Sequence, residues 1–146
     1  MSENFTNLDN ARHDDQRQVM EAINSEGHCP FCSQNLARYH KQPIIRQGEH
    51  WLLTPNQWPY EHTREHLLAI TAYHTEALKD LRPGSFEELQ QHMQWAEQAF
   101  NIASGGLAMR FGKVESNGAT VRHLHMHLIV PDEARPDDAK VRFKIS

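Results

Sequence analysis

Three histidines alternate with apolar residues near the end of this chain. The segment 122–131 reads Arg-His-Leu-His-Met-His-Leu-Ile-Val-Pro and contains His123, His125 and His127. Successive side chains of a β-strand point to opposite faces, so the pattern predicts a strand with three imidazoles on one face. A neutral imidazole can attack phosphorus, and its neighbours can donate or accept protons near neutral pH. The same spacing could instead hold a catalytic zinc ion, because a His-x-His pair can bind one metal.

The two cysteines of the chain, Cys29 and Cys32, lie in the unit Cys-Pro-Phe-Cys. A redox pair of the glutaredoxin type needs an apolar strand directly before the first cysteine, and residues 23–28 form no such strand. Two cysteines at this spacing also make half of a tetrahedral zinc site, which needs two further ligands. Zinc binding is therefore the favoured interpretation, and reduced cysteines without a metal are the alternative.

The elements that must position these residues alternate between extended and helical patterns. Apolar residues step by three or four along residues 85–102, which predicts a long helix, and Ser85 and Glu88 match a capping box at its start. The pattern predicts an α+β fold: an antiparallel β-sheet of about five strands with one long and one or two short helices on one face. Besides the histidine segment, strands are expected at 44–45, 51–53, 66–70, 107–111 and 141–145, and shorter helices at 11–24 and 74–81.

Length and composition limit the class of protein. With 146 residues the chain can form a single core, and we divide it into a partly helical N-terminal extension, 1–27, and a main domain, 28–146. The net charge of −4 argues against nucleic acid as a partner. The first 28 residues are polar and no stretch approaches 18 apolar residues, so we expect no signal peptide, no membrane partner and a cytoplasmic location.

The histidine segment resembles the signature of the histidine triad (HIT) superfamily, His-φ-His-φ-His-φ-φ with φ apolar, at all seven positions. A second block, from Glu65 to His74, is similar to the family's Gly-His-x-Leu-φ-φ-Pro-x-x-His stretch, with Glu65 in place of glycine and Thr71 in place of proline. The sequence Asn-x-x-Pro-Tyr at 56–60 is similar to a loop in the branch that cleaves diadenosine polyphosphates. The resemblance runs from about residue 29 to 131 and implies a HIT-like fold.

The resemblance implies hydrolysis or transfer at the α-phosphate of a nucleotide, with diadenosine polyphosphates such as diadenosine tetraphosphate as the favoured substrates. In this scheme His125 attacks and forms a nucleotidyl-histidine intermediate. His127 contacts phosphate oxygens or the departing group, and His66 supports the phosphate site. The further candidates for substrate binding, beside His127, are Asn56, Gly118 and Thr120.

The resemblance also implies a homodimer and a structural zinc ion. Family members with Cys-x-x-Cys near the start bind zinc through both cysteines, the histidine that ends the second block and the first histidine of the triad. These positions are Cys29, Cys32, His74 and His123. One position departs from the family, which often has a glutamine that touches phosphate where this chain has Ala119. The departure leaves the preference for a leaving group open.

Two functions of other classes remain as alternatives at this point. One is a zinc-dependent hydrolase in which the three histidines hold a catalytic metal ion. The other is a nucleotide-binding domain that kept the fold without catalysis.

Overall fold

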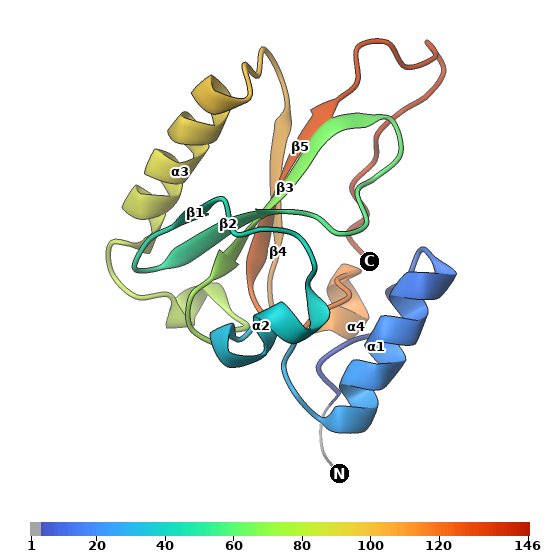
Figure 1. Ribbon diagram of the computed structural model, residues 1–146, viewed down its shortest axis with the longest axis vertical. Coiled ribbons are helices and arrows are strands. Elements are labelled where there is room, and N and C mark those ends of the chain that lie inside the picture. Colours follow the sequence, from blue (N-terminus) through green and yellow to red (C-terminus); the bar gives the residue numbers. More distant parts are fainter. Residues whose placement is uncertain (1–3) are drawn as a thin grey trace.

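A five-stranded antiparallel sheet forms the centre of the computed structural model, which describes residues 4–146 (Figure 1). β3 pairs with β5 in the middle of the sheet, with Ile70 opposite His125 and Leu68 opposite His127. This arrangement confirms the predicted α+β fold class. In the order of the sheet, the strands are β1 (Arg46–Gln47), β2 (Trp51–Pro55), β3 (Thr63–Thr71), β5 (His125–Pro131) and β4 (Gly106–Arg110).

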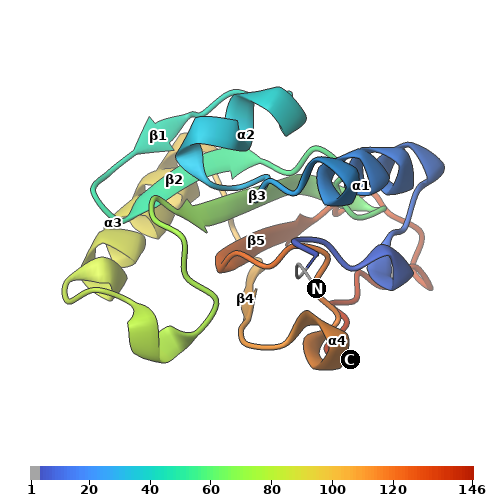
Figure 2. The same cartoon turned by 90° about the horizontal axis from the view of Figure 1, so that it is seen from below.

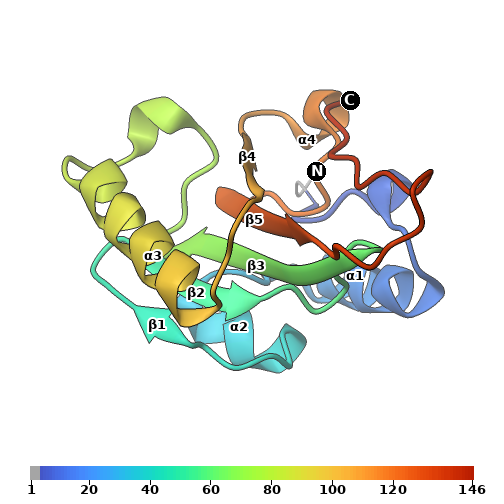
Figure 3. The same ribbon diagram turned by 90° about the horizontal axis from the view of Figure 1, so that it is seen from above.

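Helices cover both faces of the sheet. On one face α3 (Ser85–Ala99) packs Leu89 and Ala96 into the larger hydrophobic core. On the other face α2 (Ser33–Tyr39) packs Leu36 against β2 and β3, and Figures 2 and 3 show β1 and β2 between the two helices. The expectation of helices on one face is therefore wrong. Successive residues of β2 and β3 are buried in both directions, which needs cover on both faces.

Two further helices and two 3₁₀ turns complete the described chain. The helices are α1 (Asp14–Glu26), which ends at Gly27 with a left-handed φ of 75°, and α4 (Val114–Asn117). The 3₁₀ turns are Leu8–Asn10 and Leu78–Asp80. Among the described residues no helix is both long and apolar enough to span a bilayer.

Apolar residues and histidines alternate along the histidine segment, so the apolar side chains enter the core and the histidines lie on the opposite face of the sheet. Leu124, Met126, Leu128 and Val130 join the core beneath α3, so the histidines between them face the side of α2. β5 begins at His125, and His123 lies in the bend before the strand. The predicted strand with three imidazoles is thus a strand with two, preceded by the imidazole of His123, which contacts Cys29 and the Thr71 carbonyl.

Two predicted elements are replaced by irregular structure. The helix expected at 74–81 is reduced to the 3₁₀ turn, because the carbonyls of Thr75 and Glu76 accept hydrogen bonds from Leu124 and Gly112 instead of from a following helical turn. The strand expected at 141–145 does not form. The tail there uses its side chains and one carbonyl for contacts with the pocket, which are described below.

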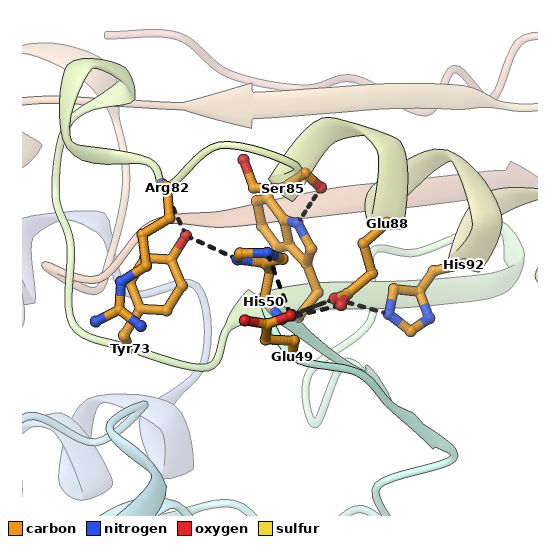
Figure 4. Close-up of polar contacts among 8 residues, drawn as sticks. Glu49, His50, Tyr73, Arg82, Ser85, Glu88 and His92 are labelled. Carbon is orange, nitrogen blue, oxygen red and sulfur yellow. Dashed lines mark hydrogen bonds and ion pairs between the residues drawn. The ribbon is translucent and has the colours of Figure 1, made fainter.

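Glu88 was expected to cap its own helix, and it joins α3 to the sheet instead (Figure 4). Gly84, with a left-handed φ of 87°, is the N-cap, so Ser85 is already helical. The Glu88 carboxylate accepts the backbone N–H groups of His50 at 2.9 Å and Trp51 at 2.7 Å. The predicted capping box is therefore wrong, because two backbone donors of the β1–β2 turn lie within reach of this side chain.

Candidate active site

His125 is buried and presents one free nitrogen to a pocket. Its Nδ1 lies 2.6 Å from the carbonyl oxygen of His123, and an oxygen of this kind only accepts, so Nδ1 carries the proton. The lone pair is therefore on Nε2. Burial lowers the pKa of His125 to about 4; the hydrogen bond to the His123 carbonyl opposes this shift in part, and the charge on Arg110 adds a smaller lowering. The ring is neutral at pH 7, as a nucleophile must be.

A chain of hydrogen bonds fixes the protons on the next two histidines. The Tyr60 N–H can only donate, and it donates to Nδ1 of His66 at 3.1 Å, so the His66 proton is on Nε2. His66 Nε2–H then donates to Nδ1 of His127 at 2.7 Å, which leaves the His127 proton on its own Nε2. That His127 nitrogen is fully buried and has no hydrogen-bond partner among residues 4–146. An orphaned N–H donor in a pocket is suited to an anion.

Both members of this pair stay neutral near pH 7. Burial lowers the pKa of His66 to about 3, and positive charge on Arg12, His125 and Arg110 adds to the effect. Burial also holds the pKa of His127 well below its usual value, with neighbouring imidazoles and guanidinium groups acting in the same direction. The rings of His125 and His127 lie 5.2 Å apart by their centroids, so a lone pair and an N–H donor sit side by side.

A cavity of about 660 Å³ lies over these rings. His125 and His127 line it, and His66 supports His127 from behind its wall. The other three candidates for substrate binding, Asn56, Gly118 and Thr120, also line the cavity. The structure therefore brings every predicted catalytic and substrate-binding residue to one place.

Asn56 is held by its own loop. Its Oδ1 accepts the N–H of Trp58 at 2.9 Å, which turns the amide nitrogen toward His66 Nε2 at 3.3 Å. Both of these nitrogens are donors in the tautomer fixed by Tyr60, so this contact is not a hydrogen bond. The Asn56 amide hydrogens remain available to a ligand in the cavity.

The four predicted metal ligands form a separate cluster. The ligand atoms of Cys29, Cys32, His74 and His123 all lie within 4.8 Å of one another. Cys29 Sγ is 3.4 Å from His123 Nδ1, and Cys32 Sγ is 3.3 Å from His74 Nδ1 and 3.7 Å from His123 Nδ1. Ligands of a tetrahedral zinc ion with normal bond lengths are about 3.5 Å apart. The cluster therefore fits zinc.

The surroundings of the cluster also fit a metal. His123 Nε2 lies 2.8 Å from the carbonyl oxygen of Thr71, and His74 Nε2 lies 3.1 Å from a Glu76 carboxylate oxygen. These acceptors hold the protons on Nε2 and leave Nδ1 of both rings free to ligate. Burial raises the pKa of the Cys29 thiol to about 12, and a bound cation would reverse that preference and stabilise the thiolate.

Sequence reasoning missed three side chains around His127. The Tyr60 ring stacks on His127 with centroids 5.9 Å apart and planes at 17°, and Phe143 meets His127 edge-on at 5.2 Å. Arg110 stands directly opposite His125 in the β4–β5 pair. The alternation of Arg110 with Met109 in a predicted strand was a usable signal, because opposed residues of antiparallel strands share a face. Phe143 had no such signal.

The geometry agrees with comparisons to known proteins. The family model described as HIT domain matches residues 37–134. No curated protein matches the chain. A Zn-bound histidine triad family protein from Mycobacterium smegmatis is 26% identical, with a TM-score of 0.56 over 80% of this chain and 81% of its own.

Two other solved structures share the fold. A HIT family hydrolase from Clostridium thermocellum is 24% identical, with a TM-score of 0.55 over 77% of this chain and 97% of its own. A diadenosine triphosphate hydrolase from Plasmodium falciparum is 22% identical, with a TM-score of 0.51 over 66% of this chain and 65% of its own. The family match covers well over half of the chain and includes the sheet and the histidine segment. The chain belongs to the histidine triad (HIT) family.

Proposed function

We propose that this protein hydrolyses nucleotides at the α-phosphate through a nucleotidyl-His125 intermediate, with diadenosine polyphosphates such as diadenosine tetraphosphate as its substrates. One observation carries the proposal: the lone pair of the buried His125 and the orphaned N–H of the buried His127 lie side by side at one cavity. A nucleophile and an oxyanion donor in that relation are what substitution at phosphorus requires.

The first step forms a bond between His125 Nε2 and the α-phosphorus and breaks the bond from that phosphorus to the bridging oxygen. The polyphosphate departs as an anion and takes the electron pair of that bond. The His125 Nδ1 proton stays on the ring and continues to donate to the His123 carbonyl oxygen, which stabilises the positive charge of the substituted imidazole. His127 Nε2–H donates to a phosphoryl oxygen or to the departing oxygen.

The second step reverses the exchange with water. Water attacks the same phosphorus, the P–N bond breaks, and His125 regains its lone pair. The water supplies one oxygen to the nucleoside monophosphate and releases one proton. The net reaction of diadenosine tetraphosphate with water gives AMP and ATP.

A zinc ion in the Cys29, Cys32, His74 and His123 cluster would act structurally. Four protein ligands complete a tetrahedral site and leave no position for substrate. The ion would join the segment before α2 to the bend before β5, and so set the direction from which His125 enters the pocket. The Zn-bound relative from Mycobacterium smegmatis supports this assignment.

The arrangement argues against a catalytic metal held by the three histidines. Both ring nitrogens of His123 are engaged away from the pocket, one toward the cysteines and one with the Thr71 carbonyl. His125 Nδ1 is engaged by the His123 carbonyl. The three imidazoles therefore cannot each direct a free nitrogen at one metal ion. A homodimer is part of the proposal through the family resemblance alone, and a cytoplasmic location through the polar N-terminal sequence.

Product analysis tests the proposal. The wild-type protein with diadenosine tetraphosphate should release AMP and ATP in equal amounts, and His125→Asn should reduce turnover by at least a thousandfold while the fold is retained. His28→Asn, at an exposed histidine outside the pocket, is the control and should keep full activity. A folded wild-type protein that binds AMP and shows no turnover would establish the binding-domain alternative instead.

A further inference from the structure

Part of the pocket wall comes from outside the segment that matches the family. The family match begins at residue 37 and ends at 134. Residues 9–23 and 140–144 nevertheless contribute side chains to the cavity above His125 and His127. In Figure 1 the C-terminal tail runs down the right side of the sheet and ends above α1. The N-terminal segment and the C-terminal tail therefore add side chains to the cavity beyond the family segment.

The N-terminal segment is anchored to the loop before the triad. Asn7 N–H donates to the Thr120 carbonyl at 2.9 Å, and Arg122 N–H donates to the Phe5 carbonyl at 2.8 Å. Asn10 Nδ2 donates to the Ala119 carbonyl at 2.7 Å. Three hydrogen bonds of this kind place the start of α1 at a defined position relative to the pocket.

Arg12 lies at the end of this anchored segment. Its guanidinium donates to the Trp58 carbonyl at 2.7 Å and lies 4.5 Å from the centroid of the Tyr60 ring. The Tyr60 ring is in turn stacked on His127. Arg12 is therefore one aromatic ring away from the orphaned N–H donor, and one hydrogen bond fixes its direction.

Arg110 approaches the same point from β4. Its Nε donates to the Lys144 carbonyl at 2.7 Å, and its guanidinium lies 3.9 Å from the centroid of the Phe143 ring, which meets His127 edge-on. A terminal nitrogen of Arg110 lies 3.5 Å from the Tyr60 hydroxyl. Two guanidinium groups from distant parts of the sequence thus flank Tyr60 and His127.

These cations have no carboxylate partner. Neither Arg12 nor Arg110 takes part in any ion pair formed within residues 4–146. Asp9 and Glu61 are the acidic residues of the cavity lining, against Arg12, Arg110, Lys140, Arg142 and Lys144. A chain with a net charge of −4 therefore concentrates unpaired positive charge around this one pocket.

We propose that Arg12, supplied by the N-terminal extension, and Arg110 bind the phosphates of the departing group, so that leaving groups with phosphates are selected over leaving groups without them. The inference rests on the proposed function and extends it to a specificity determinant that joins Arg12, outside the family segment, to Arg110, inside it. The His125 and His127 nitrogens suffice for the α-phosphate, and they offer nothing to further phosphates. Guanidinium groups bind phosphate oxygens through two parallel hydrogen bonds, which suits the observed pair.

The test compares two substrates that share the adenylyl group. Diadenosine tetraphosphate loses a nucleoside triphosphate, and adenosine 5′-phosphoramidate loses ammonia. We expect Arg12→Gln to lower kcat/KM for the tetraphosphate about tenfold to a hundredfold more than for the phosphoramidate, since one charge-assisted hydrogen bond is lost. Arg12→Lys should restore part of the difference. Arg17→Gln removes an exposed arginine of α1 that pairs with Glu21, and it should leave both values unchanged.

Arg110→Gln provides a second, independent test, in case Arg12→Gln detaches α1. It should show the same selective loss, because Arg110 belongs to β4 and does not depend on α1. Equal losses on both substrates in Arg12→Gln and Arg110→Gln, or no loss in either, would overturn the inference. If the wild-type protein cleaves neither substrate, the proposed function fails. The phosphate site is then tested by calorimetric titration with tripolyphosphate, which should bind wild type and Arg17→Gln at least tenfold more tightly than Arg12→Gln. Equal affinities would overturn it.

Discussion

The Glu88 carboxylate that joins α3 to the β1–β2 turn gives the sharpest stability prediction. It accepts the His50 and Trp51 N–H groups and the Nε2–H of His92 at 3.2 Å (Figure 4). Arg46 Nε donates to His92 Nδ1 at 3.0 Å, which fixes the proton of His92 on the nitrogen that faces Glu88. Every donor around the carboxylate is therefore directed at it.

Glu88→Gln keeps the size of the side chain and removes its charge. Three hydrogen bonds to a charged acceptor become bonds to a neutral one at a loss of about 1 kcal/mol each, and the new amide N–H₂ faces the His50 N–H. We expect the free energy of unfolding to fall by about 3 kcal/mol and Tm to fall by roughly 6–12 °C. Glu87→Gln makes the same charge change at the adjacent exposed position and should shift Tm by no more than about 2 °C.

The pH dependence separates this account from a loss of packing. Burial raises the pKa of Glu88, but the hydrogen bonds from His50, Trp51 and His92 outweigh burial, so the pKa lies below its usual value. The contribution to stability is thus present above the unfolded-state pKa of Glu and is lost as pH falls through the lower folded-state pKa. Denaturant unfolding at pH 7 and at pH 3.5 should show the wild type and Glu88→Gln converging at the lower pH. Equal effects of Glu87→Gln and Glu88→Gln at pH 7 would refute the reasoning.

Three further predictions concern the site and its support. Burial lowers the pKa of His125 to about 4 and that of His66 to about 3, so kcat should stay within a factor of about two from pH 8 to pH 5. A step in kcat near pH 6.5 would show that one of these histidines is charged before substrate binds. Removal of metal by a chelator should abolish cooperative thermal unfolding, because a structural zinc site contributes roughly 10 kcal/mol to folding. Circular dichroism measures the transition, and a metal-free protein with unchanged Tm would contradict the structural assignment. A Cβ at Gly48 would lie 2.5 Å from Glu88 Cδ, so Gly48→Ala should cost about 1–3 kcal/mol in chemical denaturation, whereas Gly106→Ala meets nothing within 4 Å and should cost under about 1 kcal/mol.

The central part of the site was predictable because it depends on local alternation. In β5, His125 and His127 must share a face opposite Met126, and the sequence pattern places them there without any knowledge of the rest of the fold. His123 lies outside the strand, which begins two residues later, and no periodicity marks that boundary. At the candidate zinc site the Cys-x-x-Cys spacing indicated Cys29 and Cys32, whereas His74 was predictable only through the family resemblance because it has no local signal of its own.

The parts of the site that were missed depend on packing between distant segments. The position of Arg12 follows from the anchoring of residues 5–10 on the loop before the triad, which no local pattern expresses. Glu88 matched a local capping motif, and backbone donors 37 and 38 residues away competed successfully for its carboxylate. Local sequence patterns therefore predicted the helices and strands that carry these residues. Hydrogen bonds between distant segments determined which groups their side chains contact.

Direct detection of the covalent intermediate tests the central claim. The protein is mixed with diadenosine tetraphosphate, quenched within one turnover at high pH, digested, and the peptides are mapped by mass spectrometry. The account predicts an adenylyl group on His125, formed before free AMP appears and absent from His125→Asn. AMP released in the first turnover with the label on His127, or with no label on any residue, would contradict it.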